Sequence, residues 1–436
     1  RRTKIVNSFF NNLLQTKTYK RGSVIKIDQF RSYERESLQK IFLDYSSSRS
    51  FRNLDAIAQS RFEKLFPELE LELLTFASPV ALLNKLIPIL EQCARRSVYL
   101  SLLNEVPLAR KRMLDLVNYS QFITQQLVKM PILLDELISV KQFNMSPTKK
   151  KLRNLLRRQM APVDLSDTEK VVEAFVYFLK AHEFQLALAQ LDGKANTEII
   201  SSYMSRVCEI ILQSIYEHAK TMLVRMYGSI NTDSQGVDTI ILAYGKLGSG
   251  ELGFGSDLDL VFIHSINKGS NTSGPKIIDG ELFIQRFVQR LINLMTANTR
   301  FGNLFDIDLR LRPSGKNGLL VQHIDAFSIY LENNAWVWEI QSLLRARVVA
   351  GDDYLKDKVE AIRLNILTKK RDQFFLRDKV REMRIKVDEF GNQNVNSLKK
   401  GRGGIIDIEF LIQFKILVYS NAYPSVIKTT GHLTQL

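Results

Sequence analysis

The sequence predicts an α+β protein that is mostly helical, with a small sheet in its second half. Three observations lead to this expectation. Apolar residues recur at helical spacing through most of residues 28–227. Residues 239–244 form an apolar, β-branched run, which is followed by a glycine-rich turn and by the alternating run 257–262, the pattern of two connected strands. Residues 304–312 alternate strictly between apolar and charged side chains and predict a further strand.

The N-terminal half is predicted to be all α. Residues 1–26 are basic and polar and are interpreted as a linker or the remnant of a helix. Ser78 and Pro79 mark a helix start, because proline is favoured at the first helical position. Lys149 to Arg158 form a basic helical face, for which a solvated surface is a simpler explanation than phosphate binding. Helices are expected over residues 79–94, 98–104, 107–118, 120–129, 131–138, 167–189 and 196–227.

Helices are expected to return after the predicted strands. Asp279 can cap the first of them through its carboxylate. Asp325 is expected to start a helix that contains both tryptophans and ends near residue 347. Residues 378–389 predict a charged helix. Residues 399–410 combine a basic glycine loop with the opening of another helix, and such a loop can approach phosphates or act as a hinge.

Composition limits the class of protein. The 436 residues are enough for two or three domains with sizeable cores. The net charge of +15 favours an anionic partner, although excess basic residues also serve solubility. Cys93 and Cys208 form no disulfide framework, which predicts a reducing, cytoplasmic setting. The five histidines form no zinc pattern, and no apolar run is long enough to span a bilayer. The chain begins with Arg1 and is interpreted as a piece of a longer protein.

Two aspartates after the glycine turn suggest metal-dependent chemistry. Side chains two positions apart on a strand share a face, so Asp257 and Asp259 point the same way while Leu258 and Leu260 point into a core. Adjacent carboxylates repel each other unless a cation lies between them. Carboxylate oxygens suit Mg²⁺ that is also bound by substrate phosphates. The alternative is a solvated turn with two surface aspartates.

The alternating run 304–312 adds charged groups of both signs to one strand face. Asp306, Asp308, Arg310 and Arg312 all lie on that face. Beside the first two aspartates, this strand would supply a third carboxylate and arginines suited to phosphate. A cross-paired surface ladder is the alternative interpretation.

The motif Gly248-Ser249, followed by Asp257 and Asp259, resembles the nucleotidyltransferase superfamily of DNA polymerase β. Longer stretches are more specific and resemble the glutamine synthetase adenylyltransferases: YGKLGSGELGFGSDLDLVF, DIDLRLRPSG, NNAWVWEIQSLLRARVV and GGIIDIEF. This resemblance implies a mixed sheet in a polymerase β-like domain, flanked by helices. Members of that family have two similar halves: one attaches AMP from ATP to a tyrosine of glutamine synthetase, and the other removes it by phosphorolysis. Trp336, Trp338 and Asp407 look like the adenylylating half.

The resemblance also implies roles for individual residues. Carboxylates would hold Mg²⁺ and activate the tyrosine hydroxyl, and donors and cations would bind the phosphates of ATP. The implied metal ligands and catalytic residues are Asp257, Asp259 and Asp308. The implied nucleotide-binding residues are Gly248, Ser249, Ser256, Arg310, Arg312 and Lys399, with Lys400 a weaker candidate. Glutamine synthetase, the PII signal protein and glutamine are the implied partners, with no nucleic acid and no membrane.

Four regions are expected. Residues 1–90 would be a helical linker or regulatory region, residues 91–235 a helical region, residues 236–350 the catalytic domain and residues 351–436 C-terminal helices that stop short of the family's full length. Three other functions stay open: removal of AMP, nucleotide transfer to RNA, and a non-catalytic regulatory domain. The last predicts a broken carboxylate triad, whereas all three acids are present.

Overall fold

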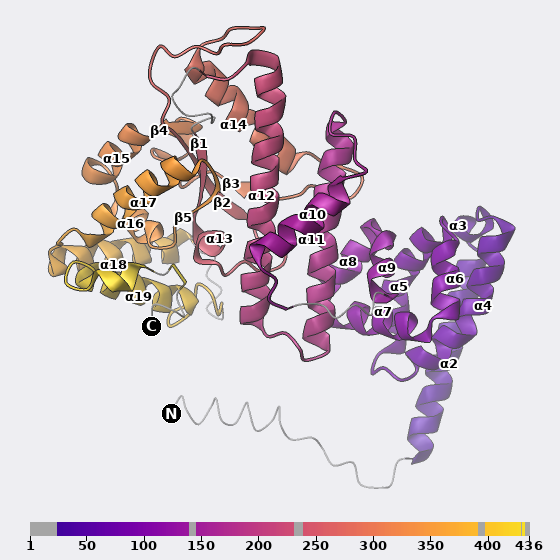
Figure 1. Ribbon diagram of the computed structural model, residues 1–436. Helices are drawn as coiled ribbons and strands as arrows, with labels where there is room; N and C mark the ends of the chain where they lie inside the picture. The colour runs from indigo at the N-terminus through magenta and orange to yellow at the C-terminus, as the bar shows by residue number, and fades with distance from the viewer. Residues whose placement is uncertain (1–23, 139–144, 231–238, 391–396, 429, 432–436) are drawn as a thin grey trace, which may run out of the picture. The chain divides into compact units, whose positions relative to one another are not determined.

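The computed structural model describes residues 24–138, 145–230, 239–390, 397–428, 430 and 431 (Figure 1). The chain divides into two compact units, residues 1–140 and 141–436. The first 23 residues, predicted as a linker or helix remnant, lie outside the described residues. The predicted boundary near residue 90 lies inside a helix, α5.

The described part of the first unit is entirely helical, as predicted. Pro79 begins α5 and Pro107 begins α7, and the Ser120 side chain caps α8 by accepting from Ile123 N–H. Its elements are α2 (Val24–Ser46), α3 (Arg49–Arg52), α4 (Ala56–Leu73), α5 (Pro79–Ala94), α6 (Val98–Glu105), α7 (Pro107–Tyr119), α8 (Gln121–Lys129), the 3₁₀ turn η1 (Pro131–Leu134) and α9 (Asp135–Ile138).

Three helices open the second unit. They are α10 (Lys149–Met160), α11 (Thr168–Leu191) and α12 (Thr197–Tyr227). Asp167 and Asn196 cap α11 and α12 through their side chains, which explains where these helices begin. The helix α10 packs against both of the others. Within the described residues no strand precedes Thr239, so the all-helical prediction for this half is confirmed.

A mixed sheet of five strands follows. Its strands are β1 (Thr239–Ala243), β2 (Leu258–His264), β3 (Ile307–Asp308), β4 (Val321–His323) and β5 (Arg347–Gly351). The central order is β3-β2-β1-β5, with β4 also paired to β2. The strand β1 is antiparallel to β2 and β5, while β3 and β4 run parallel to β2. The predicted α+β class and the mixed sheet are confirmed.

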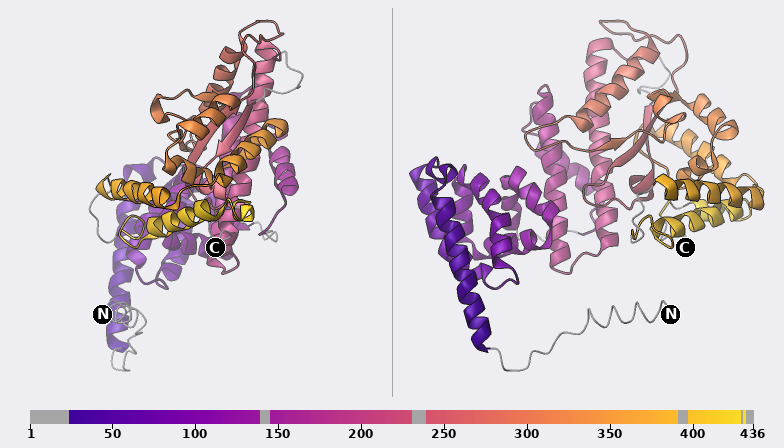
Figure 2. Two further views of the ribbon diagram at one scale, coloured as in Figure 1. Left: turned by 90° about the vertical axis from the view of Figure 1, so that its left-hand side faces the viewer. Right: turned by 180° about the vertical axis from the view of Figure 1, so that it is seen from behind.

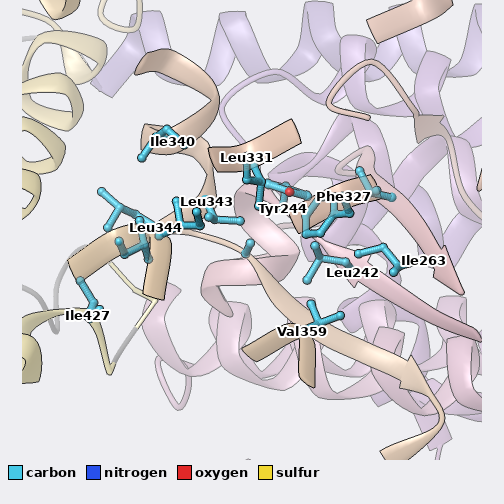
Figure 3. Packing of buried hydrophobic residues seen from close by; sticks show 14 of the residues in the cluster. Leu242, Tyr244, Ile263, Phe327, Leu331, Ile340, Leu343, Leu344, Val359 and Ile427 are labelled. Atoms are coloured by element: carbon cyan, nitrogen blue, oxygen red, sulfur yellow. The ribbon is translucent and has the colours of Figure 1, made fainter. Parts of the chain in front are cut away.

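Helices pack on the sheet and complete the unit. They are α13 (Gly245–Ser249), α14 (Gly280–Thr296), α15 (Ile324–Asn333), α16 (Val337–Leu343), α17 (Asp353–Thr368), α18 (Gln373–Phe390) and α19 (Ile405–Tyr419), with 3₁₀ turns η2 (Gly315–Asn317) and η3 (Pro424–Ile427). The sheet lies between α12 on one side and α15 to α17 on the other (Figures 1 and 2). Leu242, Ile263, Phe327, Leu343 and Val359 belong to the core on the second side (Figure 3). No helix of the described chain combines the length and apolarity needed to cross a lipid bilayer.

Two predicted elements are wrong in extent. The strand expected over residues 304–312 is only Ile307 and Asp308, because the Asp308 carboxylate accepts the Arg310 N–H and turns the chain out of the sheet. The helix expected from Asp325 to about residue 347 breaks after Asn333. There the Glu339 carboxylate accepts the Trp336 N–H at 2.8 Å and starts a separate helix, α16.

Candidate active site

The predicted carboxylates come from two neighbouring strands. Asp259 lies in β2 directly opposite Asp308 of β3 in the parallel register, and Asp257 immediately precedes β2. Leu258 and Leu260 are fully buried and Asp259 is half-buried, as the alternation predicts. Burial, followed by the charges of Asp308 and Asp257, raises the pKa of Asp259. The three acids are therefore close enough to affect one another's ionisation.

An open cavity lies beside two of these acids, Asp257 and Asp308. Its volume is about 630 Å³, and it is lined by Asp257, Asp306, Asp308, Arg310 and Arg312, together with apolar neighbours on the same segment. Both signs of charge therefore face one space, which suits a ligand that carries phosphates together with a divalent cation.

Arg310 is paired with Asp308. Its Nε donates to both carboxylate oxygens, at 2.9 and 2.7 Å, and its Nη2 also contacts Oδ2. The guanidinium remains exposed to solvent, so it can reach a ligand in the cavity as well. That Arg310 meets a phosphate stays a prediction.

Arg312 lines the cavity but has a second set of contacts. Its Nε donates to Gly318 O at 3.1 Å and its Nη1 to Leu309 O at 2.8 Å. These bonds hold together the turn that follows β3. Arg312 was predicted as a nucleotide-binding charge on a strand face, which stays a prediction, and its part in the turn was missed.

The helix α13 and the turn before it lie against Asp259. Tyr244 N–H donates to Asp259 O at 2.9 Å. Gly245 has a φ of +56°, and a Cβ there would overlap the Asp259 carboxylate. At Gly248 a Cβ would overlap the backbone carbonyls of Ala243 and Arg345. The glycines allow the turn to pack tightly against the acids, which the spacing of glycines in the sequence anticipated.

The predicted phosphate donors in α13 already have partners. Gly248 N–H donates to Tyr244 O at 3.1 Å. Ser249 is buried, and its hydroxyl lies 3.0 Å from Gly245 O and 3.0 Å from Glu251 Oε2. These groups stabilise the turn. A direct contact of Gly248 or Ser249 with a nucleotide stays a prediction.

Arg345 is a central residue that the sequence reasoning missed. One guanidinium nitrogen lies 2.8 Å from both Ser249 Oγ and Glu251 Oε2, and another donates to Glu409 Oε1 of α19 at 2.5 Å. Its charge also lowers the pKa of Asp259, as a smaller effect than the acids and burial that raise it. Arg345 therefore connects α13 to α19 and affects the acids electrostatically. Its position at the end of a predicted helix contained no signal of this role.

A second chain of ion pairs reaches α13 from α12. Arg347 pairs with Glu209 at 2.5 Å and donates to Gly248 O and Leu247 O, each at 3.1 Å. Lys149 also pairs with Glu209. Burial alone would raise the pKa of Glu209, but Arg347 and Lys149 hold it below its ordinary value. Glu209 is therefore an anion in the folded protein.

The remaining predicted site residues are exposed or partly exposed. Ser256, next to Asp257, accepts from Lys246 Nζ at 3.3 Å, which places a cation near the acids. Lys399 is exposed, and its carbonyl accepts from Ile406 N–H at 3.2 Å. Among the described residues, no side-chain bond joins Lys399 to the carboxylates.

Asp407 closes the basic glycine loop. Its carboxylate accepts from Arg384 Nε and from Gly403 N–H, and Arg384 also donates to Lys400 O at 3.0 Å. The hydrogen bond from Arg384 lowers the pKa of Asp407 most, and the Gly403 N–H lowers it further. The resemblance had singled out Asp407 by type, and the structure shows that it holds the loop at the start of α19.

The acids suit a cation that takes some of its ligands from the protein and the rest from water and a substrate. In the described part of the chain, no three acidic, histidine or cysteine side chains form a ready-made metal cage. Mg²⁺ rarely needs one, because it is usually held by one or two carboxylates, water and substrate phosphates. Asp259 and Asp308, opposite each other on paired strands, provide hard oxygen donors of that kind.

Comparison with known proteins identifies the family of the chain. The family model described as glutamate-ammonia ligase adenylyltransferase matches residues 110–362. Three similar proteins are named bifunctional glutamine synthetase adenylyltransferase/adenylyl-removing enzyme. They come from Hahella chejuensis (36% identical over 391 residues, 87% of this chain and 41% of the relative), Pseudomonas putida (36% over 405 residues, 89% and 42%) and Pseudomonas aeruginosa (35% over 416 residues, 91% and 42%). The chain spans about two fifths of the length of these relatives. From the extent of the family match, the chain belongs to the glutamate-ammonia ligase adenylyltransferase family.

Proposed function

We propose that this chain transfers AMP from ATP to a tyrosine of glutamine synthetase and releases pyrophosphate. The observation that carries the proposal is the pairing of Asp259 with Asp308 across β2 and β3, with Asp257 beside them, in a member of this family. Transfer at phosphorus needs positioning and charge neutralisation more than covalent chemistry, and this site offers both.

Asp257, Asp259 and Asp308 would hold Mg²⁺. The raised pKa of Asp259 supports this role, because mutual repulsion of carboxylates is relieved by a bound cation. When bound, Mg²⁺ would supply charge stabilisation to the phosphates of ATP and to the departing pyrophosphate.

Side chains of the chain would orient the substrates. Arg310 is exposed at the cavity and would contact a phosphate oxygen while it remains beside Asp308. Lys246, which is bonded to Ser256, would add a second cation. Asp308 would accept the proton of the tyrosine hydroxyl through its carboxylate. The compact α13, closed by Gly248 and Ser249, would keep Asp259 in place.

Replacing the acids tests the proposal. Asp257→Asn and Asp259→Asn should each lower AMP transfer by at least about 10²-fold, because each removes charge stabilisation of the transition state. Transfer is measured with ATP labelled at the α-phosphate, Mg²⁺ and glutamine synthetase. Asp325→Asn changes a carboxylate whose side chain is 81% exposed and serves as the matched control. Near-normal transfer by both site variants would contradict the assignment.

The direction of the reaction needs a separate experiment. In-line attack at the same phosphorus serves both attachment and removal, so the acids do not distinguish them. The resemblance of Trp336, Trp338 and Asp407 to the adenylylating half supports attachment. The chain should be given unmodified glutamine synthetase with ATP and, separately, adenylylated glutamine synthetase with orthophosphate. Formation of ADP in the second reaction, without AMP incorporation in the first, would contradict attachment, and label in RNA would favour the RNA alternative.

The PII signal protein and glutamine stay predictions from the resemblance. Adding each to the labelled-ATP assay tests whether it changes the rate of transfer. The role of Lys399, the more distant candidate for nucleotide contact, also stays a prediction, which Lys399→Gln tests through the concentration of ATP needed for half-maximal rate.

A further inference from the structure

A second cavity of the unit formed by residues 141–436 lies between helices and is separate from the acids. Its volume is about 750 Å³, and its walls come from α10, the turn that follows it, α11 and α12. These helices pack against one another, and Figure 1 shows α10 beside α11 and α12. Cavities of roughly 300–1,000 Å³ are typical of small-molecule sites.

The inner wall of this interhelical cavity is apolar. Leu156 and Phe175 are almost fully buried there, and Met160 and Met222 are partly buried beside them. Methionine side chains are flexible and polarisable, so they adapt to apolar ligands of different shape. The wall therefore suits the apolar body of a ligand.

Three arginines lie around the same cavity. They are Arg153 and Arg157 on α10 and Arg225 on α12. Within the described residues, none of the three forms an ion pair or a side-chain hydrogen bond. Their positive charge is therefore available to an anionic group, for which the planar guanidinium is well suited.

Two acids also line the cavity and offset part of that charge, so three arginines face two carboxylates and the lining stays net positive. Asp164 accepts from Ser166 Oγ at 2.8 Å, and Glu217 accepts from Gln213 Nε2 at 2.8 Å, so both carboxylates are held by neutral donors and neither is paired with an arginine of the described residues. The His218 Nε2 atom is buried without a hydrogen-bond partner. A buried polar atom without a partner is costly, and a ligand in the cavity could supply the missing bond.

We propose that this cavity binds an amphiphilic anion, a small molecule with an apolar body and one carboxylate, sulfonate or phosphate group. The apolar body would pack on Leu156, Met160 and Met222, and the anionic group would lie among Arg153, Arg157 and Arg225. Such a ligand satisfies both halves of the wall, whereas a neutral hydrocarbon would leave the arginines unused and a simple inorganic anion would leave the apolar wall exposed. This site is independent of the direction of AMP transfer.

The test uses two fluorescent probes of similar size. The anionic probe is 8-anilinonaphthalene-1-sulfonate, and the neutral probe is N-phenyl-1-naphthylamine. Binding to the whole chain is measured by titration with the wild type and three variants. The pocket variant combines Arg153→Gln with Arg157→Gln. The matched control combines Lys150→Gln with Arg158→Gln, which removes the same charge from the same helix outside the cavity. The third variant, Thr221→Trp, fills the cavity from an exposed position on α12.

The wild type should bind both probes saturably. The pocket variant should bind the anionic probe about tenfold more weakly than the wild type, because hydrogen bonds to charged groups are lost. Its affinity for the neutral probe should stay within about twofold of the wild type. The control should bind the anionic probe within about twofold of the wild type. Thr221→Trp should abolish saturable binding of both probes, with circular dichroism confirming that the helices are retained. Absence of saturable binding to the wild type, equal loss in pocket and control variants, or unchanged binding to Thr221→Trp would each overturn the proposal.

Discussion

The substitution Gly245→Ala should displace the carboxylate of Asp259 and reduce AMP transfer while the fold stays nearly as stable. Gly245 and Gly250 stand at the two ends of α13, with φ values of +56° and +75°. An alanine at either position meets the left-handed backbone strain of about 1–2 kcal/mol, partly offset by about 0.4–1 kcal/mol because alanine restricts the unfolded chain. Each variant should therefore lose about 1 kcal/mol of unfolding free energy.

The two positions differ in what the new methyl group meets. At Gly250 nothing lies within 4 Å of the added Cβ. At Gly245 the Cβ would lie 3.4 Å from Asp259 Cγ and would overlap Oδ2, closer than the 3.0 Å at which something must shift. The carboxylate is the end of a side chain and can rotate, so the fold survives while Asp259 loses its position. Loss of one charge-stabilising group costs roughly 10²–10³ in rate.

The assay compares the two variants in parallel. Unfolding free energy is measured by urea denaturation, and AMP transfer to glutamine synthetase with ATP labelled at the α-phosphate. Gly250→Ala should retain most of its transfer rate, whereas Gly245→Ala, equally stable, should lose at least about 10²-fold. Equal transfer rates in the two variants would refute the argument that the bare backbone at Gly245 exists to accommodate Asp259.

Three further predictions concern residues around the acids and at the far end of β2. Arg310→Ala should slow transfer but change the unfolding free energy by no more than about 0.5 kcal/mol, because the side chain is exposed. Arg312→Ala should lower the unfolding free energy by about 1–3 kcal/mol, because it removes hydrogen bonds to two backbone carbonyls. Equal stability of the two variants in urea denaturation would contradict this. Burial, followed by the charge of His323, lowers the pKa of His264 from 6.5 to about 4, so the unfolded chain binds this proton at a higher pH than the folded chain and stability should fall as the pH drops. His264→Gln should remove about 2 kcal/mol of the stability loss between pH 7 and pH 5. An unchanged pH dependence of the urea midpoint in this variant would refute the prediction. Arg345→Gln should destabilise the protein by roughly 3 kcal/mol and raise the ATP requirement, because it leaves Glu251, just after α13, and Glu409 of α19 without their cation. Glu409→Gln should have a smaller effect on both, and wild-type stability of Arg345→Gln in thermal unfolding would rule out the connection.

Features determined by local sequence were predictable. The strand β1 and the start of α14 at Asp279 depend on neighbours within a few residues, and both occur as expected. Asp308 was placed correctly beside Asp259, although the strand around it is far shorter than the alternation suggested. The alternation reports which side chains share a face, but it contains no information about where hydrogen bonding to a neighbouring strand ends.

Features that depend on distant partners were not predictable. The strand β5 was not predicted, and its first residue was expected to end a helix, because nothing near residue 347 shows that β1, about a hundred residues earlier, will pair with it. Arg345 was missed for the same reason, since its partners Glu251 and Glu409 lie 94 and 64 positions away. Helical and strand propensities are weak compared with such tertiary contacts.

The contacts of Gly248 have a consequence for how the protein is made. Its carbonyl accepts from Arg347, 99 positions later, and from Thr430, 182 positions later. At a synthesis rate of about 5–20 residues per second, the second of these partners leaves the ribosome roughly 10–40 s after the turn itself. During that interval α13 has emerged without the groups that close it, and the glycines that allow its tight packing give it the greatest freedom. The carbonyl of Gly248 thus gains its second partner only after residue 430 has emerged, long after the acids themselves.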